Sequence, residues 1–190
     1  MRGLLRRRVV QVGLVVALVL LAGGLWAFQP WRLWTRSTVD EALPEGFAPV
    51  ATTAAPAVPG SAPASDTATP TTPSTPVGPR VLAEGAFVSQ EHTTSGTARV
   101  LEQGGDRVLR LEGFSTSDGP DLFVWLSAAE AGGSWGKYDD GRYVSLGKLK
   151  ATDGNHNYAI PADVDLAGLR SAVIWCDRFN VSFGSAALAL

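Results

Sequence analysis

The stretch from Ser171 to Gly184 constrains the fold most strongly, and it holds the only cysteine of the chain. Residues 172–175 are apolar without interruption, whereas a strand with one face in water would alternate apolar and polar residues. The sequence therefore predicts a strand covered on both faces. Residues 178–180 predict a turn, and a half-exposed strand is expected from residue 181. Cys176 is thus expected within a sheet rather than on a loop.

The residues around this stretch have a pattern that is typical of an all-β domain. About 110 residues, 80–190, are enough to bury a core, and a single cysteine allows no internal disulfide. Short β-type runs alternate with turns, which predicts an antiparallel β-sandwich or a barrel-like domain of about eight short strands. The predicted strands lie near residues 84–89, 97–103, 107–113, 122–127, 143–149, 156–160, 171–177 and 181–188.

The N-terminal part of the chain predicts a membrane anchor. Residues 1–8 are basic, and residues 9–28 carry no charge, long enough as a helix to span roughly 30 Å of hydrocarbon. Arginines are more numerous before the apolar run than after it, which predicts a single-pass transmembrane helix with a cytoplasmic N-terminus. The domain that follows is then extracytoplasmic, at the cell membrane. A cleaved signal peptide is the rival interpretation.

Two segments connect the apolar run to the β domain. Residues 29–45 form a juxtamembrane segment, in which residues 35–44 are compatible with a short helix or with irregular chain. Residues 46–79 hold eight of the twelve prolines among many alanines, threonines and serines, which predicts a disordered linker. As an extended chain it would reach on the order of 100 Å and would hold the domain away from the membrane.

The charge of the β domain excludes one class of partner. Residues 80–190 contain ten lysines and arginines against fourteen acidic residues, with no basic cluster interleaved with aromatic residues. Binding to phosphates requires a basic face, so we expect no nucleic acid partner. Signature motifs of hydrolases and a glycine-rich phosphate loop are also missing from the sequence, so no such enzyme activity is expected.

Cys176 is the sharpest candidate for chemistry, and two interpretations of it stay open. Free cysteines are often buried and merely fill space in a core. An unpaired cysteine outside the cytoplasm is nevertheless exposed to oxidation, and the nearby Arg178 would favour a reactive thiolate. The residues alone therefore allow either a packing role or a redox role.

Several motifs of the β domain, in register, resemble one known family. They are Gly119-Pro-Asp-Leu122 with Val124-Trp-Leu-Ser127, then Leu146-Gly-Lys-Leu-Lys150, and finally Ile174-Trp-Cys-Asp-Arg-Phe-Asn-Val-Ser-Phe-Gly184. This pattern resembles the DM-thirteen domain, described as an electron-transfer domain, over about residues 81–190. The resemblance implies a redox role for Cys176, either as a free thiol or as a ligand of a prosthetic group such as haem, and a redox partner protein.

The possible ligands of a cofactor are few. No Cys-x-x-Cys-His motif is present, and Met1 is the only methionine, so Cys176, His92 and His156 are the main candidates for haem ligation. The family often shows a histidine near the position of His92, whereas His156 departs from the family pattern. The cofactor stays unknown, with haem as one possibility. No metal site is predicted, because the spacing of the ligands matches neither zinc nor calcium motifs.

A glycine-rich loop over residues 131–141 offers a second kind of function. It contains Trp135 and Tyr138, which are expected to be exposed, and exposed aromatic side chains on loops often stack on sugars or proteins. The resemblance to the DM-thirteen domain implies instead a redox or electron-transfer domain centred on Cys176. Its alternative is a non-catalytic module that binds polysaccharide or protein of the cell envelope through this loop.

Overall fold

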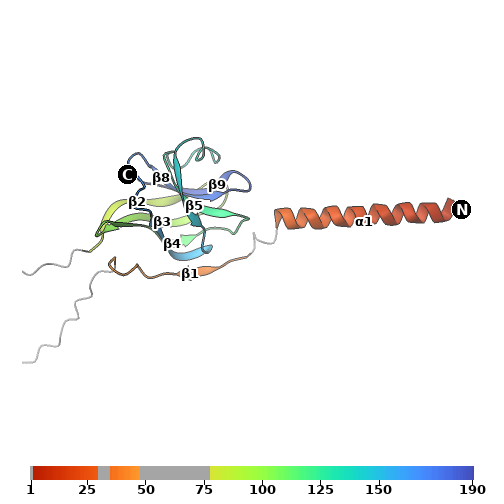
Figure 1. Ribbon diagram of the computed structural model, residues 1–190, viewed down its shortest axis with the longest axis horizontal. Coiled ribbons are helices and arrows are strands. Elements are labelled where there is room, and N and C mark those ends of the chain that lie inside the picture. The colour runs from red at the N-terminus through yellow and green to blue at the C-terminus, as the bar shows by residue number, and fades with distance from the viewer. Residues whose placement is uncertain (1, 30–34, 48–77) are drawn as a thin grey trace, which may run out of the picture.

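The computed structural model describes residues 2–29, 35–47 and 78–190. Helix α1 (Arg2–Phe28) projects away from a β domain (Figure 1), and no part of its apolar stretch Val10–Ala27 is buried. The length and composition of this stretch suit a membrane span or a signal sequence. Most of the predicted linker, 46–79, lies outside the described residues.

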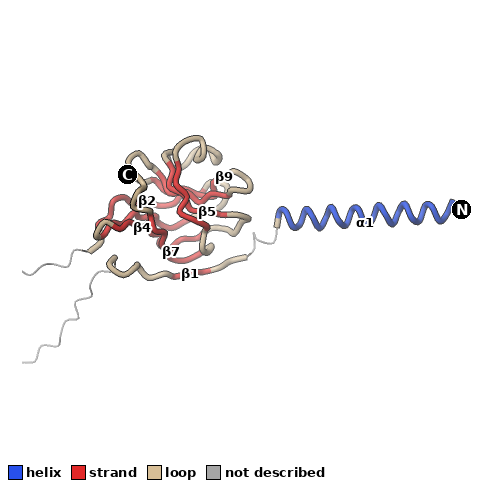
Figure 2. Tube along the Cα trace, viewed as in Figure 1, coloured by secondary structure: helices blue, strands red, loops and turns tan. Residues whose placement is uncertain are grey.

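Nine strands form one sheet within the described residues, in the order β1-β7-β4-β3-β2-β9-β8-β5-β6. Figure 2 shows the strands gathered in one domain, with β1 along its edge. All eight predicted strands are present, and the ninth is the N-terminal β1. The prediction of an all-β domain is confirmed. The strands are β1 (Thr38–Asp40), β2 (Arg80–Ser89), β3 (Ser95–Gln103), β4 (Asp106–Ser115), β5 (Leu122–Ser127), β6 (Tyr143–Lys148), β7 (Asp153–Ile160), β8 (Ser171–Cys176) and β9 (Val181–Ala187).

The sheet curls because strand β2 changes partners along its length. Its first residues pair with β3, and residues 87–89 pair with β9. Gly85 allows this crossing, because a Cβ atom there would lie 1.9 Å from the carbonyl oxygen of Ala187. The two halves of the curled sheet enclose one core, to which β4 contributes Leu109 and β8 contributes Ile174, both fully buried. The main core cluster therefore draws on strands from both halves of the sheet.

The hairpin of β8 and β9 agrees with the sequence in one strand and differs in the other. All six residues of β8 are buried, as the unbroken apolar run predicts. Strand β9 was expected to be half exposed, and this was wrong, because residues 182–186 are all buried. The Gly132 amide donates to Ser185 Oγ and the Thr94 hydroxyl donates to the Phe183 carbonyl, so two loops cover this strand.

Strand β1 is the element that the sequence did not reveal. It adds to the edge of the sheet parallel to β7, in the segment where a short helix or irregular chain was expected. Gly154 of β7 permits this pairing, since a Cβ atom there would lie 2.1 Å from the carbonyl oxygen of Val39. A three-residue strand that owes its pairing to a distant glycine leaves no periodic pattern in its own sequence.

Candidate functional site

Cys176 ends strand β8 inside the core of the domain. Its side chain has no exposed surface, and its thiol donates a hydrogen bond to the Pro120 carbonyl oxygen at 3.3 Å. Burial raises the pKa of the Cys176 thiol, and the nearby Asp121 carboxylate raises it further. The thiol is therefore protonated at neutral pH and closed to solvent.

A polar pocket lies on the other side of the segment that accepts this hydrogen bond. Its volume is about 340 Å³, and both Pro120 and Asp121 belong to its wall. Strand β8 continues from Cys176 into Asp177, whose amide donates to the Asp121 carbonyl at 3.1 Å. Residues 120–121 thus separate the sulfur atom from the pocket. The lining residues that carry charge are Asp118, Asp121, Lys148, Lys150 and Arg178.

Asp121 is the centre of the charged contacts in this wall. Lys148 Nζ lies 3.0 Å from Asp121 Oδ1, and Arg178 Nη2 lies 3.6 Å from Oδ2. The hydrogen bond from Lys148 holds the pKa of Asp121 below its usual range, with a further contribution from Arg178. Asp121 also has a φ of 63°, an uncommon conformation for a residue other than glycine. Two cations thus hold this strained residue beside the thiol.

The structure does not bring the two histidines to Cys176. The ring of His92 lies 3.9 Å from that of Phe183, and burial lowers the pKa of His92. His156 is fully buried on β7, its Nε2 lies 3.1 Å from the Asp153 carbonyl oxygen, and burial lowers its pKa. No contact joins either ring to the sulfur, and the described part of the chain contains no cluster of three potential metal ligands.

A haem held by Cys176 does not fit this arrangement. The sulfur atom is fully buried behind residues 120–121 and does not line the pocket, so it presents no lone pair to a ligand there. His92, the other candidate ligand, does not line the pocket either. Axial ligation of haem requires a side chain that reaches the iron directly. Neither Cys176 nor His92 is therefore placed to bind a haem in this pocket.

The aromatic residues of the glycine-rich loop take opposite positions. Trp135 is 51% exposed, as expected. Tyr138 was expected to be exposed and is instead fully buried, because its hydroxyl lies within hydrogen-bond distance of Ser185 Oγ, at 2.9 Å, and of Gln90 Oε1, at 3.1 Å. Its ring packs edge-on against Trp175 at 6.5 Å. Tyr138 thus holds the loop onto the sheet, and Trp135 is left as the aromatic residue that this loop offers to a partner.

Stacked aromatic rings connect the strand of Cys176 to the surface. Trp175 stacks on Trp125 with ring centroids 4.7 Å apart, and Trp125 stacks on Tyr143 at 4.1 Å. Trp175 is fully buried, whereas Tyr143 is 44% exposed. The indole nitrogen of Trp175 is buried and has no hydrogen-bond partner among the residues that the structure describes. The three rings form a continuous contact from the interior to solvent on the face of β8 opposite Cys176.

The charged wall of the pocket was not predicted from the sequence. Asp121, Lys148 and Arg178 are separated by more than 20 residues, and no local spacing links them. All three nevertheless lie in the motifs on which the family resemblance rests. The motifs could have indicated the site, because the three segments that they mark all contribute to the wall of the pocket.

The comparisons with known proteins gave one match. A family model described as "Electron transfer DM13" matches residues 86–188, more than half of the chain. The matched range includes Cys176, both histidines, Trp135 and the charged wall residues. Neither the search of curated proteins nor the search of solved structures found a match.

Proposed function

The chain belongs to the Electron transfer DM13 family, and on this premise we propose that it is a membrane-anchored redox module centred on Cys176. Helix α1 would span the membrane, with the basic N-terminus in the cytoplasm and the β domain outside. The length and apolar composition of α1 support this arrangement, together with the arginines that precede the span. A redox partner protein would meet the domain on that side.

The contact between Cys176 and the pocket wall carries the proposal. The thiol donates to the Pro120 carbonyl, directly behind the residue that Lys148 and Arg178 hold. The thiolate is the reactive form of cysteine, and nearby cations stabilise it. A movement of residues 120–121 would expose the sulfur to the pocket and to the charges of Lys148 and Arg178. In this proposal the wall controls when the thiol reacts.

The test compares the redox capacity of the full chain with that of two variants. Wild type, Cys176→Ser and Trp135→Ala are incubated with a small aromatic disulfide, and their fold is checked by circular dichroism. In the wild type the Cys176 sulfur should bond to one sulfur of the reagent while the other sulfur leaves as a thiol, so the protein is oxidised and the reagent is reduced. We expect Cys176→Ser to release no thiol while staying folded, and Trp135→Ala to release it as the wild type does. Equal thiol release by wild type and Cys176→Ser would refute a redox role for this thiol.

The exposure of Trp135 supports one alternative function. A half-exposed indole on a loop that Tyr138 holds in place is a suitable platform for a sugar ring or a protein side chain. The alternative is therefore a non-catalytic module that binds polysaccharide or protein of the cell envelope. Pull-down of envelope polysaccharide that is lost in Trp135→Ala and unchanged in Cys176→Ser would favour it.

A haem titration gives a separate check of the site. The buried sulfur predicts that adding haem to the folded full chain produces no Soret band that depends on Cys176. A band that saturates near one equivalent and is lost in Cys176→Ser would show that the wall opens far enough for ligation.

A further inference from the structure

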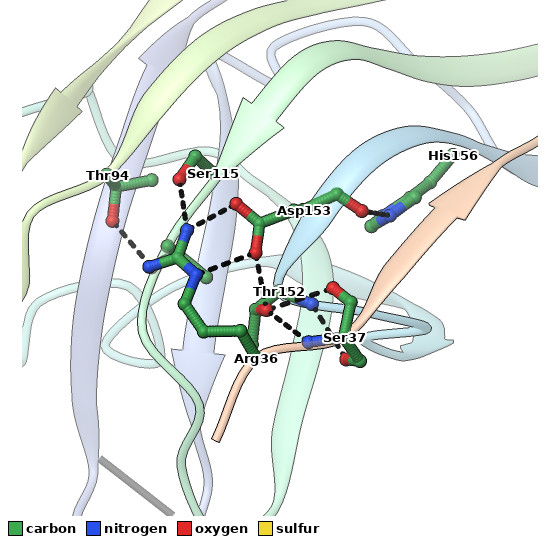
Figure 3. A network of polar contacts seen from close by, with 8 residues as sticks. Arg36, Ser37, Thr94, Ser115, Thr152, Asp153 and His156 are labelled. Carbon is green, nitrogen blue, oxygen red and sulfur yellow. Dashed lines mark hydrogen bonds and ion pairs between the residues drawn. The ribbon is translucent and has the colours of Figure 1, made fainter. Parts of the chain in front are cut away.

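Residues 35–47, which we call the docking segment, are bound along the edge of β7. Figure 3 shows Arg36 in contact with the Asp153 carboxylate and with Ser115 Oγ, the latter at 2.8 Å. The neighbouring Ser37 exchanges hydrogen bonds with Thr152, whose hydroxyl donates to the Ser37 carbonyl at 3.0 Å. The hydrogen bond from Arg36 holds the pKa of Asp153 below its usual range. This end of the segment is therefore fixed by charge and by hydrogen bonds.

The other end of the docking segment is fixed by Glu41 and Phe47. The Glu41 carboxylate lies 2.7 Å from Lys150 Nζ and accepts a hydrogen bond from the Asn157 amide at 2.7 Å. The amide of Glu41 also donates to the Asn155 carbonyl at 2.9 Å. Phe47 is only 4% exposed and packs against the β domain in a small apolar cluster of its own. Contacts along its whole length hold the segment to the domain.

The docking segment leads directly to the pocket beside Cys176. Thr35 Oγ1 donates to Asp118 Oδ2 at 2.7 Å, and Ser37 lines the pocket. From the side of α1, Gln29 lines the same pocket and Arg178 Nη1 donates to the Ala27 carbonyl at 2.8 Å. The pocket therefore lies at the end of the domain that adjoins the C-terminus of α1.

Chain length keeps the pocket near that helix while the segment is docked. Only seven Cα–Cα steps separate Phe28 from Thr35, so a fully extended chain spans at most about 25 Å. Without docking, residues 30–79 would connect α1 to β2. Fifty residues average about 40 Å as a flexible coil and about 150 Å as an extended polyproline II chain. While the segment is docked, the distance between α1 and the β domain is therefore limited by residues 29–35 and does not depend on the proline-rich stretch.

We propose that the docking segment holds the pocket-bearing end of the β domain against the lipid surface, so that the pocket beside Cys176 faces the membrane. This inference rests on the proposed anchoring by α1. It replaces the expectation that residues 46–79 hold the domain away from the membrane. With the segment docked, Phe47 and Arg80 both lie near the β3–β4 hairpin, so the connection from α1 to the domain does not depend on residues 48–77.

The test measures the distance of two labelled positions from the bilayer in the full chain. One label is attached through Phe179→Cys, in the turn beside the pocket, and the other through Asp106→Cys, at the start of β4. The β3–β4 turn lines a small pocket with Gly78 and Arg80, and Figure 1 shows that the chain enters β2 at the end opposite α1. Both labelled chains also carry Cys176→Ser, so that the introduced cysteine is the only thiol. Energy transfer to fluorescent lipid in liposomes reports each distance.

The decisive variant opens the docking segment without changing residues 78–190. Arg36→Glu places like charges beside Asp153, and Glu41→Pro removes the amide and the carboxylate that hold the strand. In the wild type we expect strong transfer from position 179 and weak transfer from position 106. In the double variant we expect this difference to be lost, with weaker transfer from position 179. Glu45→Ala, an exposed position in the same segment, is the matched control and should behave as the wild type.

Two further experiments test whether the distances depend on the linker and whether the chain is anchored: a linker deletion and a liposome flotation assay. Removing residues 53–72 should leave both signals unchanged when the segment is docked and should strengthen them in the double variant. Equal transfer from the two positions in the wild type, or a wild-type signal that follows linker length, would overturn the proposal. Failure of the full chain to float with liposomes would instead refute the anchoring itself. Neither readout depends on electron transfer at Cys176, so the redox proposal is judged separately.

Discussion

At the scale of single residues, burial raises the pKa of the Cys176 thiol most, and Asp121 adds a smaller increase. Its carboxylate disfavours a negative charge on the sulfur, so replacing it by a neutral amide should lower the pKa of the thiol. We expect Asp121→Asn to react faster than wild type with a small thiol reagent at neutral pH. The reaction rate is measured from pH 6 to 10, with Asp163→Asn as an exposed control. An unchanged rate would show that burial alone keeps the thiol inert.

Tyr138 should matter for stability although it was expected to bind a partner. Tyr138→Phe removes a buried hydroxyl that lies 2.9 Å from Ser185 Oγ, which should lower the free energy of unfolding by about 1–2 kcal/mol. Tyr143→Phe is the matched control, because Tyr143 is half exposed and should change stability by less than about 0.5 kcal/mol. Urea denaturation measures both. Equal losses would contradict the structural role assigned to Tyr138.

At the scale of elements, β1 should leave the sheet in acid. Arg36 lowers the pKa of Asp153, so this contact contributes fully above the ordinary aspartate pKa of about 3.9 and is lost as the pH falls through the lowered value. We expect the amide NMR shifts of Val39 and Glu41 to move toward undocked values below about pH 4. In Asp153→Asn these shifts should lie nearer the undocked values already at pH 7. A wild-type titration that matched Asp153→Asn would exclude this carboxylate as the switch.

At the scale of the whole molecule, stability should fall as the pH drops from 7 to 5. Burial lowers the pKa of both His92 and His156, so the unfolded chain takes up protons near pH 6.5, before the folded one does. His92 packs on Phe183 and His156 packs on Phe114, and both phenylalanines belong to the main core cluster, so both histidines act on global unfolding. His156→Gln should flatten the dependence of the unfolding midpoint on pH. An unchanged slope would assign the effect to His92 alone.

Local patterns in the sequence were enough to predict the main elements and the family of this protein. The alternation of apolar and polar residues, together with the turn residues, located eight strands. The unbroken apolar run of residues 172–175 predicted that strand β8 is buried. These predictions succeeded because each pattern depends only on residues close together in the chain. The motifs in register indicated the DM13 family, which the family model confirmed. The apolar helix at the N-terminus was also predictable from the sequence, because its length and composition identify it.

The contacts between remote elements, in contrast, follow from the three-dimensional fold. It buried Tyr138 and covered β9, because loops from other parts of the chain fold over them. It placed Asp121, Lys148 and Arg178 in one wall behind which Cys176 is sealed. It also added residues 38–40 to the edge of β7, more than 100 residues away in the chain. Such contacts depend on distances between remote backbone segments, and no local pattern of residues encodes them.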